Sequence, residues 1–319
     1  MSFMVENKLL FDWIYTLIAL VGIIFIIFCL EQIYKKAHIP AYITRKMLHL
    51  VIGLLVCLSV PIIYTPIPIV VIASIFIIVN WFAVKRQKLK SVHINASSYG
   101  TVYYPLAAII LVLFLWQDDK PAFVLAILIM SLADTLAGII GDRYARKYFV
   151  PAGEKKSVIG STGMFLTTFI ILTAGFIYFY CFTLEDSLIF ALIISIPVTV
   201  TETLSSKGSD NLFVPVVAAL CIYIVHGNTE ESLKYQLIYG EILSIIICYL
   251  SFYFKFLNIS GMLIVFLLGT IIFGLGALAF AVPILTFYIF SSLLSKMGKK
   301  RKKLIILFLL LKEYISHQI

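Results

Sequence analysis

An aspartate inside an apolar stretch is the residue of this sequence whose type and position point most directly to chemistry. Asp134 lies within the apolar segment 121–140, about two helical turns from its end. A carboxylate inside such a segment is costly, so it is a candidate functional group. Ala137, Gly138 and Gly141 follow at helical spacing and form a face of small residues beside it. Packing between helices explains these small residues but not the aspartate.

Two lysines and the start of the next apolar segment follow the aspartate along the chain. Lys155 and Lys156 come just before Ser157 and Gly160. Free backbone N–H groups and the helix dipole favour a phosphate at a helix N-terminus, and adjacent lysines add positive charge to such a site. These residues therefore predict an anion site that binds phosphate groups.

Carboxylates in the same region supply candidate metal ligands. Mg²⁺ usually takes one or two carboxylates together with substrate phosphates. Asp134, with Asp142, would hold such an ion, and Glu202 is a further acid near the end of an apolar segment. Acids, a metal ion and paired lysines around one pocket would suit a nucleoside triphosphate.

Three other polar stretches stand at the ends of apolar segments. The residues that we single out in them are Arg45, Lys46 and His49, then Tyr99, and then Asp210 and Asn211. Each stretch also has a structural explanation, because basic residues anchor spans and tyrosines gather at membrane interfaces. Asp210 and Asn211 would likewise cap the helix that follows them.

The composition places these residues in a membrane protein. Hydrophobic residues make up 62% of the chain and charged residues 13%, against about 25% charged in a typical globular protein. Apolar runs long enough to span a bilayer recur at about 10–30, 47–64, 67–84, 101–117, 121–140, 161–182, 187–203, 211–226, 237–257, 260–275 and 277–294. The runs are continuous and do not alternate as barrel strands do. The sequence therefore predicts an all-α, polytopic membrane protein with about 11 transmembrane helices.

The basic residues fall almost entirely in alternate connections between these runs. Examples are the segments 85–90, 143–156 and 296–303. The positive-inside rule makes that side cytoplasmic and places the N-terminus outside. The candidate residues stand on the same side, so we expect an active site that faces the cytoplasm. This bias accounts for the net charge of +9, and we expect no nucleic-acid partner.

Four of these motifs, in this order, resemble those of the membrane family of CTP-dependent polyprenol, dolichol and phytol kinases, which is related to the CDP-diacylglycerol synthases. The matching residues are Arg45, Lys46 and His49; Ser98, Tyr99, Gly100, Tyr104 and Pro105; Asp134, Ala137, Gly141, Lys155, Lys156, Ser157 and Gly160; and Glu202, Asp210, Asn211 and Pro215. The chain departs from the family pattern at Ala145, where the family has glycine. It departs again at Ile159, where the family often has an acid that the phytol-kinase branch replaces. Each departure would lower activity.

The resemblance implies phosphoryl transfer from CTP to the hydroxyl of a long-chain isoprenoid alcohol such as phytol, geranylgeraniol or a polyprenol. The roles that it implies are phosphate binding for Arg45, Lys155 and Lys156, Mg²⁺ binding for Asp134, and acceptance of the hydroxyl proton by Glu202 or His49. The soluble kinase folds are not expected, because the chain has neither a P-loop nor the HRD and DFG motifs of protein kinases. The sequence leaves the alcohol and the oligomeric state open.

Two other functions remain as alternatives at this point. A cytidylyltransferase that makes a CDP-lipid, such as a phosphatidate cytidylyltransferase, would use the same pocket but attack the α-phosphorus of CTP. A transporter would use Asp134 and Glu202 as ion-coupling groups. Transporters place such groups near the membrane midplane between inverted repeats. Here the acids gather near one face, which favours an enzyme at the interface.

The domain organisation that we expect has three parts. Residues 1–230 form the kinase-like membrane domain. Residues 231–303 resemble part of a second membrane family, which includes phytyl-phosphate kinase. The residues that carry this second resemblance are Ser260, Gly261, Gly269, Gly274, Gly276, Ser291, Ser292, Lys296 and Gly298. Residues 304–319 form a tail that we expect to be truncated, and its apolar run is too short to span a bilayer.

Overall fold

The computed structural model of this chain describes residues 2–37, 41–85, 98–227 and 231–297. Contacts within the chain divide it into two units, Met1–Tyr235 and Gln236–Ile319. Each unit is described by itself. The expected tail, residues 304–319, lies outside the described residues.

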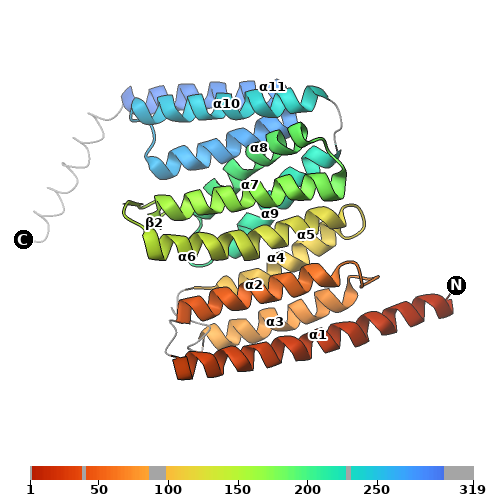
Figure 1. Cartoon of the computed structure of the whole chain (residues 1–319). Coiled ribbons are helices and arrows are strands. Elements are labelled where there is room, and N and C mark those ends of the chain that lie inside the picture. The colour runs from red at the N-terminus through yellow and green to blue at the C-terminus, as the bar shows by residue number, and fades with distance from the viewer. Residues whose placement is uncertain (1, 38–40, 86–97, 228–230, 298–319) are drawn as a thin grey trace, which may run out of the picture. The chain divides into compact units, whose positions relative to one another are not determined.

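Helices make up nearly all of the first unit. They are α1 (Ser2–Ala37), α2 (Ala41–Ser59), α3 (Ile67–Lys85), α4 (Gly100–Leu115), α5 (Lys120–Leu128), the π-helix η1 (Ile129–Ala133), α6 (Asp134–Tyr144), α7 (Val158–Tyr180), α8 (Leu184–Leu204) and α9 (Asp210–Gly227). Between α6 and α7, strands β1 (Tyr148–Phe149) and β2 (Lys156–Ser157) pair antiparallel, with Tyr148 opposite Ser157. Figure 1 shows α6 alongside α7, with this hairpin at their shared end.

Two helices account for most of the rest of the chain. Helix α10 covers Glu231–Tyr253 and begins just before the second unit, and α11 covers Ile259–Met297. The two predicted spans 260–275 and 277–294 both fall inside α11. Each of the other predicted spans overlaps one helix, or the continuous run α5–η1–α6, by most of its length.

The predicted all-α, polytopic membrane architecture is confirmed. Among the described residues, seven helices are long and apolar enough to cross a membrane, and four shorter apolar helices accompany them. Helices satisfy every interior backbone group within one segment, which is what a bilayer requires. The number of spans and an outer N-terminus stay predictions.

The run α5–η1–α6 lies at the centre of the first unit. In the most apolar 18-residue stretch of this run, 56% of the residues are buried. In the corresponding stretch of Asn7–Leu30 in α1, 6% are buried. Phe123 of α5 and Ile129 of η1 are fully buried, whereas Ile18 and Phe25 of α1 are 65% exposed. Exposed apolar faces of this extent suit lipid rather than water. Asp134 therefore begins a helix that other protein segments surround.

A polar cluster around Asp119 connects the ends of three helices, at the end of the α5–η1–α6 run opposite to α6. The carboxylate of Asp119 accepts hydrogen bonds from the backbone N–H of Ala122, at 3.0 Å, and from the hydroxyl of Tyr180, at 2.8 Å. His226 Nδ1 lies 3.0 Å from its other oxygen. Asp119 thus caps α5 and links it to the ends of α7 and α9, which is a structural role.

Candidate active site

Lys46 of α2 and Asp134 of α6 form one ion pair. The Lys46 Nζ atom lies 2.9 Å from the main-chain oxygen of Asp134 and 3.5 Å from its carboxylate Oδ2. Each side chain is only 15% exposed. A second link joins the same segments, because the hydroxyl of Thr135 donates to the main-chain oxygen of Lys46 at 3.3 Å. The costly carboxylate that the sequence indicates therefore has a cation beside it.

The π-helix η1 positions Asp134. It ends at Ala133, directly before the aspartate. A π-turn adds a residue to the helical repeat and re-aims the side chains that follow, and such turns are frequent at functional sites. Helix α2 approaches η1 closely at Gly53, where an added Cβ would clash with Ser131 and come within 2.9 Å of the Tyr104 hydroxyl. This approach holds Lys46 beside the start of α6.

Lys156 and Glu202 form a second, tighter pair. Lys156 Nζ donates to Glu202 Oε1 at 2.6 Å, with 16% and 11% of the two side chains exposed. Burial alone would lower the pKa of Lys156, but the negative charges of Glu202 and Asp210 outweigh it and raise the pKa above its ordinary value. Lys156 is therefore positively charged throughout the neutral pH range.

Asp210 joins the two pairs into one group. It stands at the first position of α9, within electrostatic range of the other four charged side chains. We call this group the charge cluster, and its members are Lys46, Asp134, Lys156, Glu202 and Asp210. Three carboxylates and two ammonium groups from α2, α6, β2, α8 and α9 thus share one region.

The segment that carries Tyr99 packs against the loop between α8 and α9. The backbone N–H of Tyr99 donates to the main-chain oxygen of Lys207 at 3.0 Å, and the Asn211 side chain donates to that of Gly100 at 3.1 Å. Gly208 has φ of +85°, and an added Cβ would overlap the backbone of Gly100. Only glycine fits there. Tyr99 and Asn211 therefore fix the loop that ends at Asp210.

Gly141, Gly160 and Ser157 have clear structural roles. A Cβ on Gly160 would come within 3.1 Å of the Ala137 oxygen and 3.4 Å of the Gly141 Cα, so the two glycines allow α6 and α7 to meet. The Ser157 hydroxyl accepts from the backbone N–H of Gly160 at 3.1 Å and caps α7. Their predicted part in nucleotide binding stays a prediction.

Four predicted site residues are not members of the charge cluster as we define it. Lys155 is exposed, and its Nζ lies 3.9 Å from the ring centroid of Tyr148. Asp142 is exposed at the other end of α6. The His49 ring packs against that of Tyr104, with centroids 5.0 Å apart. The side chain of Arg45 is not among those described.

The charge cluster has the donor set that a magnesium ion prefers. Carboxylate oxygens of Asp134, Glu202 and Asp210 are hard ligands, and Mg²⁺ needs only one or two of them beside substrate phosphates. Within the described residues, no three His, Cys, Asp or Glu side chains converge closely enough to hold a metal alone. Asp142 follows Asp134 by eight residues in one helix, about 12 Å of rise, so the structure does not bring these two acids to one ion.

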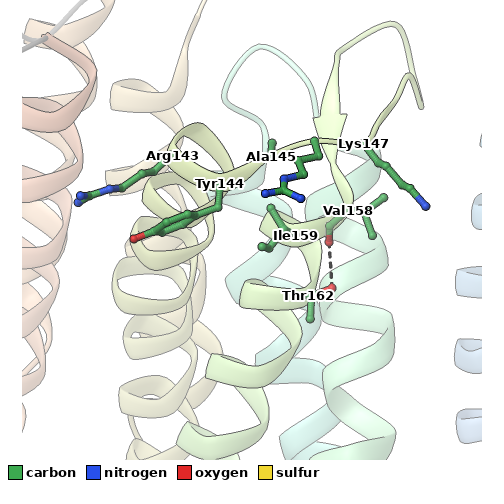
Figure 2. A pocket seen from close by; sticks show the side chains of 8 residues that line it. Arg143, Tyr144, Ala145, Lys147, Val158, Ile159 and Thr162 are labelled. Atoms are coloured by element: carbon green, nitrogen blue, oxygen red, sulfur yellow. Dashed lines mark hydrogen bonds between the residues drawn. The ribbon is translucent and has the colours of Figure 1, made fainter.

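A pocket of about 770 Å³ lies beside the hairpin, between the end of α6 and the start of α7. Figure 2 shows Arg143 and Tyr144 at one end of it, Lys147 and Val158 at the other, and Ile159 between them. None of its lining residues belongs to the charge cluster. Both departures from the resembling family's pattern, Ala145 and Ile159, line this pocket.

Several features of the site are invisible in the sequence. The π-helix η1 has no residue signature that we can identify. Gly138 is visible only as a small residue near Asp134, yet an added Cβ there would overlap the end of the Lys46 side chain. The small residue leaves room for the ammonium group that pairs with Asp134.

Gly138→Ala is therefore expected to displace Lys46 from Asp134. We expect about a tenfold loss of rate, equivalent to about 1.4 kcal/mol, and only a small loss of thermal stability, because the better helix propensity of alanine offsets part of the cost of leaving Asp134 without its cation. The measurement is the turnover rate alongside thermal unfolding. Gly22→Ala in α1 is the control, since an added Cβ there meets nothing within 4 Å. Equal rates in both variants would show that the position of Lys46 does not matter.

The chain is similar in sequence to proteins named phytol kinase and to one named farnesol kinase. It is 30% identical over 195 residues to a phytol kinase of Synechocystis sp., a match that covers 60% of this chain and 82% of the relative. It is 26% identical over 247 residues to phytol kinase 1, chloroplastic, of Arabidopsis thaliana, which covers 71% of this chain and 80% of the relative. A farnesol kinase, chloroplastic, of the same plant is 27% identical over 213 residues, or 61% of this chain and 69% of the relative.

The C-terminal part of the chain matches a family model. Residues 242–307 match the family described as Integral membrane protein DUF92. This match begins a few residues after the boundary between the two units, which falls between Tyr235 and Gln236. No solved structure matches the chain.

Proposed function

The chain belongs to the phytol kinase family of integral membrane proteins, and on that premise we propose that it phosphorylates a long-chain isoprenoid alcohol with CTP as the donor. The alcohols we propose are phytol, geranylgeraniol or a polyprenol. The observation that carries the proposal is the charge cluster, in which two lysines and three carboxylates from five elements meet. The names of the relatives support an alcohol of this class.

A protein catalyses phosphoryl transfer mainly by positioning the nucleotide and the acceptor and by stabilising negative charge on the phosphates. Lys156 supplies a fixed positive charge, because its carboxylate neighbours keep it protonated. Lys46 supplies a second cation at Asp134. Together they would hold and orient the phosphate oxygens of the nucleotide, in a region largely removed from solvent where such contacts are strong.

The carboxylates of the cluster would hold Mg²⁺ together with the nucleotide. We propose Asp134 as the principal ligand and Asp210 as a second, because both lie in the cluster and present oxygen donors. When bound, the ion would neutralise charge on the phosphates being transferred. Asp142 would take no part in this site.

The hydroxyl of the alcohol must lose a proton as its oxygen bonds to the γ-phosphorus and CDP leaves. We propose Glu202 as the acceptor of that proton. Its carboxylate lies in the charge cluster, beside Lys156. A phosphate that forms an ion pair with Lys156 would free the Glu202 carboxylate from that lysine. Glu202 would then accept a hydrogen bond from the hydroxyl of the alcohol, as a general base must. The hydrocarbon tail would extend among the apolar helices.

The choice of donor tests the proposal most simply. Membranes that contain the protein are given phytol, Mg²⁺ and one of CTP, UTP, GTP or ATP at equal concentration. We expect phytyl phosphate to form at least tenfold faster with CTP than with any other nucleotide. Membranes with the Asp134→Asn variant serve as the blank. Formation of the same product at equal rates from ATP would contradict the proposed donor.

We also propose that the site faces the cytoplasm, because the basic connections share its side. A variant without the five native cysteines would carry Ala152→Cys in the hairpin turn or Glu185→Cys at the start of α8. Both positions are exposed, and they lie at opposite ends of α7. An impermeant thiol reagent added to intact cells should label Cys at 185 and not at 152. The reverse pattern would invert the topology and place the site outside.

A further inference from the structure

The pocket beside the hairpin is lined by basic side chains that do not form ion pairs among the described residues. Arg143, Arg146 and Lys147 are among its lining residues, and Figure 2 shows the side chains of Arg143 and Lys147 extending to opposite sides. Across the described residues, no ion pair joins these three side chains to a carboxylate. All three are exposed. Guanidinium groups bind phosphate oxygens in a bidentate manner, so these cations give the rim of the pocket a positive charge that attracts a phosphate group.

An apolar track leads away from this pocket along α7. Val158 and Ile159 line the pocket itself, on the first turn of the helix. Thr162, Leu166 and Ile170 continue the face that begins at Val158, at four-residue spacing, and the Thr162 hydroxyl donates to the main-chain oxygen of Val158 at 2.9 Å. These side chains are 49%, 51% and 65% exposed at Val158, Leu166 and Ile170. Because α7 is one of the helices that can cross a membrane, this track would run from the interface into the hydrocarbon region.

We propose that the pocket binds the headgroup of an anionic phospholipid whose chains lie along this track of α7. The exposed track requires acyl chains beside it, and the cations require a negative counter-charge. An anionic phospholipid satisfies both. The headgroup site is separate from the charge cluster, so the lipid is a bound component of the membrane rather than the molecule being phosphorylated.

The size and the place of the pocket agree with this occupant. Its volume of about 770 Å³ is in the range of small-molecule sites and accommodates a phosphodiester headgroup with its glycerol. Basic residues beside a membrane surface attract anionic lipids by about fivefold each. Removing both arginines should therefore weaken binding by about 25-fold.

The test uses the full chain in nanodiscs of phosphatidylcholine with 10 mol% phosphatidylglycerol that carries a photoreactive diazirine near its headgroup end. Crosslinked peptides are mapped by mass spectrometry. The variant is Arg143→Ala/Arg146→Ala. The charge-matched control is Lys36→Ala/Lys85→Ala, which removes two exposed cations from the ends of α1 and α3 on the same predicted side. The readout needs no turnover, so it is independent of the proposed phosphoryl transfer.

We expect label in the 158–170 segment of α7, about 25-fold less label in the arginine variant, and no loss in the control. Arg143→Gln/Arg146→Gln should reproduce the loss with less change in side-chain volume. Equal labelling by a photoreactive phosphatidylcholine, or full labelling of the arginine variants, would overturn the proposal. Displacement of the phosphatidylglycerol label by an equimolar amount of phytyl phosphate would also overturn it, because it would assign the pocket to that lipid.

Discussion

Lys156→Met is expected to lower the rate of phosphoryl transfer by about 30- to 1,000-fold, which corresponds to about 2–4 kcal/mol of lost transition-state stabilisation. The reason is that Lys156 is buried in the charge cluster and is held protonated by Glu202 and Asp210. Lys155→Met removes the same charge from the neighbouring residue. Because Lys155 is exposed over the Tyr148 ring, that variant should lose less than about threefold, since exposed charges contribute little.

The loss in Lys156→Met must be separated from damage to the fold. Removing the lysine leaves the carboxylate of Glu202 without its cation, which is itself destabilising. The double variant Lys156→Met/Glu202→Gln removes both charges and should recover thermal stability but not activity. Recovery of activity in the double variant would contradict both the phosphate-binding role of Lys156 and the proton-accepting role of Glu202.

Asp134→Asn is the second change with a large expected effect. Asparagine has the same shape and keeps the main-chain oxygen that accepts from Lys46 at 2.9 Å, so the change isolates the negative charge. We expect at least a hundredfold loss of turnover and a higher Mg²⁺ requirement in the remaining activity, because Mg²⁺ loses an anionic ligand. Initial rates across a Mg²⁺ titration measure both.

Asp142→Asn is the matched control on the same helix. Its side chain is exposed and distant from the cluster, so its rate should change by less than about twofold. Full turnover of Asp134→Asn at limiting Mg²⁺ would mean that Asp134 serves only to pair with Lys46. A loss in Asp142→Asn as large as that in Asp134→Asn would restore the paired metal site that the sequence predicts.

The membrane architecture follows from the sequence because its physical cause is local. An apolar run of sufficient length becomes a helix in a bilayer whatever the other segments do. The predicted span 121–140 shows both the success and its limit. The structure has a helix there, but it contains the π-helix η1, which packs closely against α2 at Gly53 and which the apolar pattern does not predict.

Which of two adjacent lysines enters the site is a different kind of question. Lys155 and Lys156 are equivalent as sequence, but only Lys156 belongs to strand β2, and Lys155 directly precedes it. Lys156 reaches Glu202 and Lys155 lies over Tyr148. The glycines give a similar case, since Gly141 and Gly160 match a nucleotide motif and also allow two helices to touch. Spacing alone does not separate these roles.

The sequence itself does not show which residues far apart along the chain pair with each other in the charge cluster; only the resemblance to a family groups their motifs. The pair of Lys46 and Asp134 is 88 residues apart in the sequence, and that of Lys156 and Glu202 is 46 apart. No periodicity relates such positions, because they are brought together by the order in which helices pack. The grouping of Asp210 with both pairs likewise depends on the loop that Gly208 and Asn211 fix.

The most direct test of the central claim asks which phosphorus of CTP reaches the lipid. Membranes that contain the protein are given phytol and CTP labelled either at the γ- or at the α-phosphorus, with the Lys156→Met variant as the blank. A kinase transfers the γ-phosphoryl group and releases CDP, whereas a cytidylyltransferase transfers CMP and releases pyrophosphate. We predict lipid-extractable label from γ-labelled CTP only. Label from the α position, with phosphatidic acid as the better acceptor, would contradict the account and identify a cytidylyltransferase.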